Sequence, residues 1–170
     1  MSKSTKPSKE DQKNLEEKLG EVLGLERAAQ KAVTELNSMK LLDSGSKKEV
    51  IGMKDEANSH EEQIIKLISD ISKENEAVKI DQDSIEETAK ETEKKAVKMM
   101  KTYLGEDPDS SEAIEFLAIA EGAEVIHYEV LNAISKNFKI KELSNTISSI
   151  LKEEQKHLQL CIDLAKGSVS

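Results

Sequence analysis

Apolar residues recur every three or four positions along most of the chain, a period that predicts long amphipathic helices. Short polar or glycine-containing stretches separate the periodic segments and predict turns. No stretch shows the strict alternation of a half-buried β-strand, so the pattern predicts an all-α protein. The expected helices span about residues 9–39, 47–75, 84–104, 110–136 and 141–166.

Short polar residues at the expected helix starts predict N-caps, because their side chains accept hydrogen bonds from unpaired backbone N–H groups. Gly105 to Pro108 should end the third helix, and Asn137 to Lys139 should break the chain before the last one. Gly20 and Gly24 weaken the first helix locally, but they would allow a neighbouring helix to approach closely. The predicted capping pairs are Ser8 with Asp11, Ser46 with Glu49, Ser84 with Glu87, and Asp109 with Glu112.

Composition supports a single helical domain. The 170 residues include two Phe, two Tyr, no Trp and two Pro, and this length is sufficient for one domain with a sizeable core. We expect a helical bundle over residues 9–167, with residues 1–8 as a disordered tail. The Lys- and Ser-rich start has no apolar stretch, so we do not expect it to act as a signal peptide.

Charge and cysteine content narrow the expected partners. The net charge of −9 argues against nucleic acid, since phosphate binding needs a basic face. No apolar run approaches the roughly 18 residues of a membrane span, so we expect no membrane insertion. The single cysteine, Cys161, excludes an internal disulfide and fits a reducing compartment, so we expect a cytoplasmic protein.

Polar residues interrupt the apolar stripe of the last expected helix. Glu154 and His157 fall inside this stripe, three positions apart, so their side chains share one face. A carboxylate and an imidazole that face a core must be paired, hydrogen-bonded or bound to metal. The stripe itself consists of Leu143, Ile147, Ile150, Leu158 and Cys161.

Other expected helices offer similar inward groups. Glu26 lies in the stripe of the first helix and His60 in that of the second. The two halves of the chain look like copies of one helix pair, because 34 positions separate Glu26 from His60 and 33 separate Glu124 from His157. Carboxylates and imidazoles suit iron, manganese or zinc. The candidate metal ligands are Glu26, His60, Glu121, Glu124, Glu154 and His157.

This constellation resembles the ferritin/rubrerythrin superfamily of di-metal carboxylate bundles, which place a Glu on each of two helices and Glu-x-x-His on the other two. Glu121 and Glu124 match the inward pair of the third bundle helix, and Glu154 with His157 matches the motif of the fourth. The stretch from Val125 to Val130 is similar to a small bacterial stress-associated branch. The resemblance implies a ferritin-like antiparallel four-helix bundle whose long crossover carries the extra helix at residues 84–104.

The first half of the chain departs from the family pattern. Ala57 stands where the family has a Glu three residues before His60. Glu56 and Glu61 are near, but a helical wheel places them on the flanks of the stripe. One bridging carboxylate is therefore missing or supplied from another direction, and the site is expected to be asymmetric.

Several of these residues also have purely structural interpretations. Glu154 and His157 could form a buried hydrogen-bonded pair, His60 could be a satisfied core histidine, and Glu121 could lie at the rim of a helix interface. His127 fits helix packing better than metal binding, and Tyr128 either packs or donates its hydroxyl to a carboxylate. Met99 and Met100 are expected to fill the core.

Three functions follow from the sequence. The resemblance implies a non-haem iron or manganese protein, with two ions if the site is intact. Such a protein would react with dioxygen or peroxide in oxidative-stress defence or iron handling. An oxidase- or peroxidase-type enzyme activity is one form that this reaction could take. The second function is a metal-free structural or interaction bundle. The third is a helical adaptor, which an exposed apolar stripe at residues 84–104 would support. A homodimer is the expected assembly.

Overall fold

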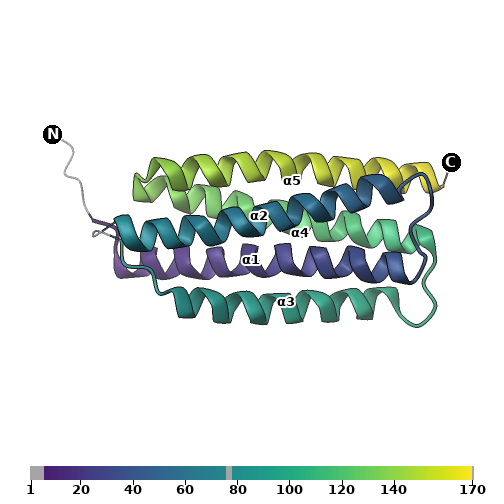
Figure 1. Cartoon of the computed structure of the whole chain (residues 1–170), viewed down its shortest axis with the longest axis horizontal. Helices are drawn as coiled ribbons and strands as arrows, with labels where there is room; N and C mark the ends of the chain where they lie inside the picture. The colour runs from purple at the N-terminus through teal and green to yellow at the C-terminus, as the bar shows by residue number, and fades with distance from the viewer. Residues whose placement is uncertain (1–5, 76–77, 170) are drawn as a thin grey trace.

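The chain is all-helical in the computed structural model, which describes residues 6–75 and 78–169 (Figure 1). The predicted all-α class is confirmed, since these residues contain no strand. The predicted disordered tail lies largely outside the described residues, and Lys6 to Ser8 precede the first helix without regular structure. The helices are α1 (Lys9–Ser38), α2 (Lys47–Glu74), α3 (Gln82–Leu104), α4 (Ser110–Ser135), the 3-10 turn η1 (Lys136–Phe138) and α5 (Lys141–Ser168).

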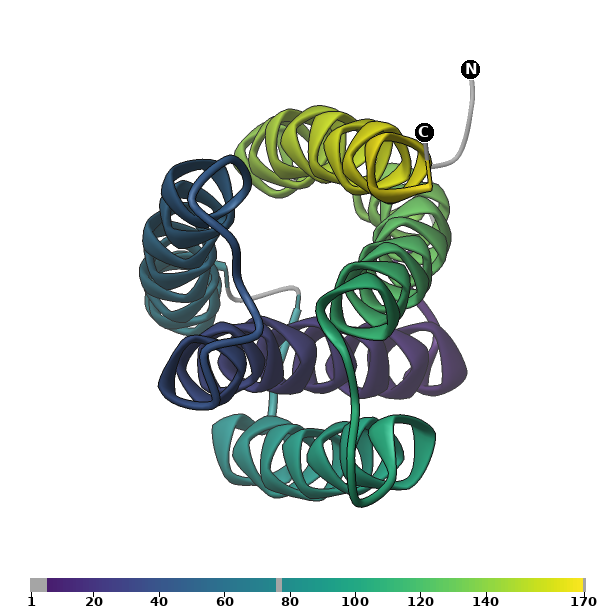
Figure 2. The same ribbon diagram turned by 90° about the vertical axis from the view of Figure 1, so that its right-hand side faces the viewer.

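Four of the helices surround a common interior. Figure 2 shows α1, α2, α4 and α5 arranged around this interior, with α3 outside it against α1. Consecutive helices run in opposite directions along the long axis, so α2 and α4 point the same way and the connection containing α3 crosses the length of the bundle (Figure 1).

Two of the four predicted capping boxes are confirmed. Ser8 and Asp11 exchange the expected side-chain and backbone hydrogen bonds at the start of α1, as do Asp109 and Glu112 at the start of α4. Gly105, with a positive φ of 67°, ends α3 as predicted, because glycine adopts this backbone conformation without steric penalty.

The other two capping predictions are wrong. Ser46 makes no side-chain cap, and the Oδ1 atom of Asp43 accepts from the Ser46 backbone N–H at 2.8 Å. At the start of α3 the cap is Asp81, whose side chain accepts from the backbone N–H groups of Asp83 and Ser84. In both cases a carboxylate three residues earlier forms the stronger, charge-assisted hydrogen bond.

Apolar side chains form two separate clusters along the bundle, and each of the four inner helices contributes to both. The first cluster includes Leu19, Ile64, Leu131 and Ile147, and the second includes Leu36, Val50, Leu117 and Cys161. In every inner helix, the stretch between its two contributions carries the inward polar residues predicted above. A polar layer therefore separates two apolar clusters.

Two glycines set the position of α3. A Cβ atom at Gly20 would lie 2.6 Å from the Cβ of Thr88, and one at Gly24 would collide with the carbonyl oxygen of Ala89 and lie 2.7 Å from the Cβ of Thr92. These distances are too short for real contacts, so α3 lies this close only because both α1 positions lack a side chain. The predicted close approach of a neighbouring helix is thus confirmed.

The one arginine of the chain joins three helices. Arg27 of α1 donates from Nε to Glu61 of α2 at 2.9 Å, and its two terminal nitrogens donate to Glu86 of α3 at 2.8 and 3.1 Å. The second contact is a two-point fork that a lysine cannot reproduce. Arg27 therefore fixes α2 and α3 relative to α1 directly beside the polar layer.

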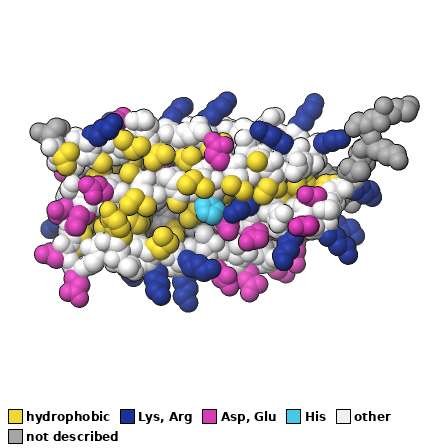
Figure 3. Space-filling model, turned by 180° about the vertical axis from the view of Figure 1, so that it is seen from behind, with side chains coloured by type: hydrophobic (Ala, Val, Ile, Leu, Met, Phe, Trp, Pro, Cys, Tyr) yellow, Lys and Arg dark blue, Asp and Glu magenta, His cyan; other side chains and the backbone are white. Residues whose placement is uncertain are grey.

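The outer surface of α3 differs from the prediction. Met100 is buried as expected, but Met99 is 67% exposed and Tyr103 is 47% exposed, because α3 lies outside the four inner helices and packs mainly against α1. Figure 3 shows that hydrophobic side chains gather on the face of the molecule opposite to that of Figure 1. Packing of α3 along α1 counts against the adaptor function, whose groove would need a free α3 stripe.

None of the helices that the structure describes has an apolar stretch long enough to cross a membrane.

Gly24→Ala should destabilise the protein by about 1 to 3 kcal/mol, because the new methyl group forces α3 away from α1. Gly52→Ala is the matched control, since a Cβ atom there meets nothing within 4 Å. The control should stabilise the protein by about 0.5 to 1 kcal/mol through helix propensity. Chemical denaturation of both variants measures the difference, and equal stabilities would contradict the assigned α1–α3 contact.

Candidate metal centre

All six predicted ligands lie in the polar layer, and all are buried. Glu26 comes from α1, His60 from α2, Glu121 and Glu124 from α4, and Glu154 and His157 from α5. Their exposed fractions run from 0% for Glu26 and His60 to 6% for His157. Residues far apart in the sequence thus meet because each occupies the middle of its helix, between the two apolar clusters.

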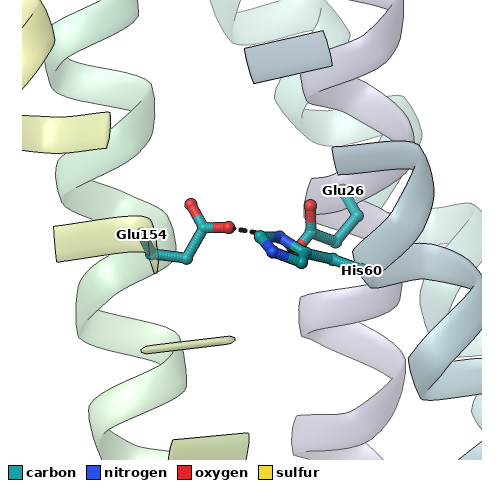
Figure 4. Close-up of side chains that lie close together, drawn as sticks. All are labelled: Glu26, His60 and Glu154. Atoms are coloured by element: carbon teal, nitrogen blue, oxygen red, sulfur yellow. Dashed lines mark ion pairs between the residues drawn. The ribbon is translucent and has the colours of Figure 1, made fainter. Parts of the chain in front are cut away.

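The first group of donors contains Glu26, His60 and Glu154 (Figure 4). The Nδ1 atom of His60 lies 2.7 Å from Oε1 of Glu154 and 3.3 Å from Oε1 of Glu26. Figure 4 shows the three side chains pointing toward one another, and both carboxylates approach the same ring nitrogen of His60. One donor atom from each of the three side chains lies within 4.8 Å of the others, close enough to bind one ion.

The second group contains Glu121, Glu154 and His157. The Nδ1 atom of His157 lies 3.4 Å from Oε2 of Glu154 and 3.6 Å from Oε2 of Glu121. Glu154 belongs to both groups and presents a different oxygen atom to each histidine. If each group held an ion, Glu154 would be shared between the two.

Glu124 lies in the same buried layer but completes neither group of three. It interacts electrostatically with Glu121, Glu154 and Glu26. The structure thus brings five predicted residues into two donor groups and places the sixth beside them.

A carboxylate faces the outer nitrogen of each histidine. The Nε2 atom of His60 lies 2.6 Å from Oε2 of Glu153, and the Nε2 atom of His157 contacts Glu56. Such contacts orient an imidazole and keep its inner nitrogen directed at a metal. Glu56 therefore supports His157 from outside the layer and does not replace the carboxylate missing at Ala57. Sequence reasoning missed Glu153 altogether.

Tyr128 hydrogen-bonds to a carboxylate of the centre, which was one of the two roles expected for it. Its hydroxyl donates to Oε1 of Glu26 at 2.5 Å inside the bundle. His127, the next residue back, faces away from the layer, and its Nδ1 atom lies 3.1 Å from Glu21. This placement agrees with the packing role expected for His127.

Several buried oxygen and nitrogen atoms of the layer have no hydrogen-bond partner among the described residues. They are Oε2 of Glu26, Nδ1 of His60, Oε2 of Glu121 and both carboxylate oxygens of Glu154. Short nitrogen–oxygen approaches without hydrogen-bond geometry are costly in a dry core, unless the atoms share an ion. This donor set therefore fits a transition-metal site.

Burial makes the carboxylates of the layer hard to ionise. It raises the pKa of Glu121 and of Glu124, and the neighbouring carboxylates raise both further. Burial also raises the pKa of Glu26 to about 7, although contacts with His60 and Tyr128 oppose the change. Without metal, protons must therefore neutralise part of this charge.

The pKa values of Glu154 and of the two histidines shift in the direction that favours their charged forms. Burial opposes ionisation of Glu154, but contacts with His157 and His60 outweigh it and lower the pKa of this carboxyl. Burial lowers the pKa of His60, yet Glu154, Glu26 and Glu153 together raise it to about 11. The pKa of His157 is raised for the same reason, by Glu154 and Glu56. Bound cations would take the place of these protons.

Comparisons with protein-family models, curated proteins and solved structures found no match to this chain. The assignment of the centre therefore depends on the geometry of its own residues.

The metal-free protein should become more stable as the pH falls from 8 to 5.5. The pKa of Glu26 is raised to about 7 in the folded state, so its protonation stabilises the fold below that pH and the effect is lost as pH rises. The raised pKa of His60 acts in the same direction above pH 6.5. The lowered pKa of Glu154 acts only below about pH 4.5 and leaves this window unaffected.

Thermal melts in the presence of a chelator measure this dependence. Glu26→Gln should reduce this dependence, most of all below about pH 7, whereas Glu142→Gln, an exposed change on α5, should retain it in full. A melting temperature that rises with pH in the metal-free protein would contradict the assigned burial of the carboxylates.

Proposed function

We propose that the protein is a ferritin-like metal-binding protein whose polar layer holds two divalent ions. Iron or manganese is the expected metal, and zinc suits the same donor types. The observation that carries the proposal is that buried oxygen and nitrogen atoms gather into two groups that share Glu154, and that several of them have no hydrogen-bond partner among the described residues. The proposed role is in oxidative-stress defence or iron handling, with dioxygen or peroxide as the reacting partner.

The helix arrangement supports this assignment. Proteins of the ferritin-like class carry one Glu on each of two helices and Glu-x-x-His on the other two, all facing the interior. In this chain α1 supplies Glu26, α4 supplies Glu121 and Glu124, and α5 supplies Glu154 with His157. The α2 helix supplies His60 without the paired carboxylate, so the two ions would have unequal ligand sets.

Charge balance supports two ions rather than one. Two divalent ions carry about four positive charges, and the four buried glutamates of the layer carry four negative charges when ionised. One divalent ion would balance only two of these charges, so the other two glutamates would have to remain protonated.

Each protein group has a definable task in such a centre. Bound iron or manganese would supply the redox chemistry with dioxygen or peroxide. Glu154 holds the two sites together, and Tyr128 fixes the orientation of Glu26. Glu153 and Glu56 orient the two histidines from outside. The two apolar clusters exclude water from either end of the layer.

A metal-free structural bundle is the second candidate function. The specific observation in its favour is Ala57, because no described carboxylate takes the place of the missing ligand beside His60. Replacement of buried charges by apolar groups often leaves a metal-free bundle equally stable or more stable. Metal content separates the two functions. The expected homodimer and cytoplasmic location stay predictions.

The wild-type protein should bind about two equivalents of iron after loading with ferrous iron under argon. Glu154→Gln keeps the shape of the side chain but removes the shared charge, so binding should fall below about one equivalent. Glu142→Gln is the control on the same helix and should leave metal content unchanged. Plasma mass spectrometry of the desalted proteins measures iron, manganese and zinc together.

Loading should also raise the melting temperature of the wild-type protein, since an ion that binds only the folded state stabilises it. One equivalent in the wild type would mean that the site on the α2 side binds no metal. No metal in any of the three proteins would refute the metal-binding function and favour the structural bundle.

A further inference from the structure

An apolar pocket opens between α1, α3 and α4, with a cavity volume of about 90 Å³. Among the described residues that line it, Glu124 is the one charged side chain, and the others are apolar. Met99 of α3 and Ile119 of α4 are two of its more exposed members, so they lie at its mouth. We call it the α3 pocket.

The pocket reaches from the surface to the polar layer. Its lining includes Glu124, which is 3% exposed and lies in the layer beside Glu121 and Glu154. On the face shown in Figure 3, hydrophobic side chains surround a hollow in the surface. The pocket thus connects this apolar face with the candidate metal centre through the gap between three helices.

Small residues keep the pocket open. Six of its lining residues are alanines, and they come from all three helices. In a bundle whose clusters are otherwise filled by Leu, Ile and Val, alanines on three facing helices leave space that larger side chains would occupy. Gly20 and Gly24 fix the distance of α3 from α1 and so fix the width of the pocket.

The size and lining define the ligand class. An engineered cavity of about 150 Å³ in another protein binds benzene or xenon when its walls are apolar. The α3 pocket is somewhat smaller, but it opens to solvent at one end, so a molecule of benzene size can enter it and project from the mouth. A peptide helix or a second copy of this chain is too large to reach Glu124.

We propose that the α3 pocket binds a small uncharged apolar molecule next to Glu124, and that this molecule is the substrate class presented to the metal centre. The substrate part of this inference rests on the proposed function, whereas the binding part stands on the pocket alone. The apolar walls exclude charged and strongly hydrated molecules from this route. Glu124 marks the end of the pocket at which a bound molecule meets the centre.

Benzene titration of the metal-free protein, followed by ligand-observed NMR, tests the binding part. We expect saturable binding to one site. Ala96→Leu and Ala29→Leu each place three more carbon atoms in the pocket and should weaken binding at least tenfold. Neither residue is a candidate ligand, so metal binding should survive. Ala133→Leu is the matched control, because Ala133 is exposed on α4 outside the pocket.

Manganese loading tests the position of the bound molecule. Bound Mn²⁺ is paramagnetic and should strongly increase the proton relaxation rate of benzene in the wild type and in Ala133→Leu. Ala96→Leu should bind Mn²⁺ equally well by electron paramagnetic resonance but show little increase. Relaxation that is unaffected by Mn²⁺ in a protein that binds both molecules would overturn the position beside the centre.

The two proposals fail in different ways. Absence of benzene binding in the metal-free wild type, or equal binding by the filled variants, overturns the α3 pocket as a ligand site. Absence of iron, Mn²⁺ and zinc binding with normal benzene binding leaves the pocket in place, but refutes the metal centre and with it the substrate assignment.

Discussion

The rest of the structure depends on the need to neutralise four carboxylates inside a helical bundle. Glu26, Glu121, Glu124 and Glu154 lie within one layer, too close together and too dry to remain fully ionised without cations. The two histidines, the hydroxyl of Tyr128 and the outer glutamates all converge on this layer. A bundle selected for stability alone would fill the same space with leucine. In the proposed function, bound cations neutralise this layer in place of protons.

Much of the fold and the site could be predicted because helical period is a local property. Glu26, His60 and Glu154 each interrupt an apolar stripe, and an inward polar residue is visible from its own helix. Confirmed features such as the Ser8 cap and the Gly105 helix end are also set by residues within a few positions. The six candidate ligands could therefore be predicted from patterns inside single helices. They lie at the same level along the bundle because each falls near the middle of its helix.

Features that depend on contacts between helices could not be predicted. Glu153 lies on the flank of its own stripe, and only the placement of α2 beside α5 brings it to His60. Met99 has the spacing of a core residue, but α3 buries one narrow face, and this side chain lies outside it. The caps at Asp43 and Asp81 result from competition between neighbouring acceptors. The α3 pocket is lined by alanines from three helices, and their common position becomes visible only when the arrangement of these helices is known.

The close contact between α1 and α3 also constrains how this sequence can change. Gly20 and Gly24 meet Thr88, Ala89 and Thr92, so a larger residue on one helix requires a compensating change on the other. These positions should vary together among homologous chains, whereas a chain without α3 would be free to carry any helix-favouring residue at both glycines. The glycine pair is accordingly a sequence marker for the presence of α3, independent of whether the ligands of the polar layer are retained.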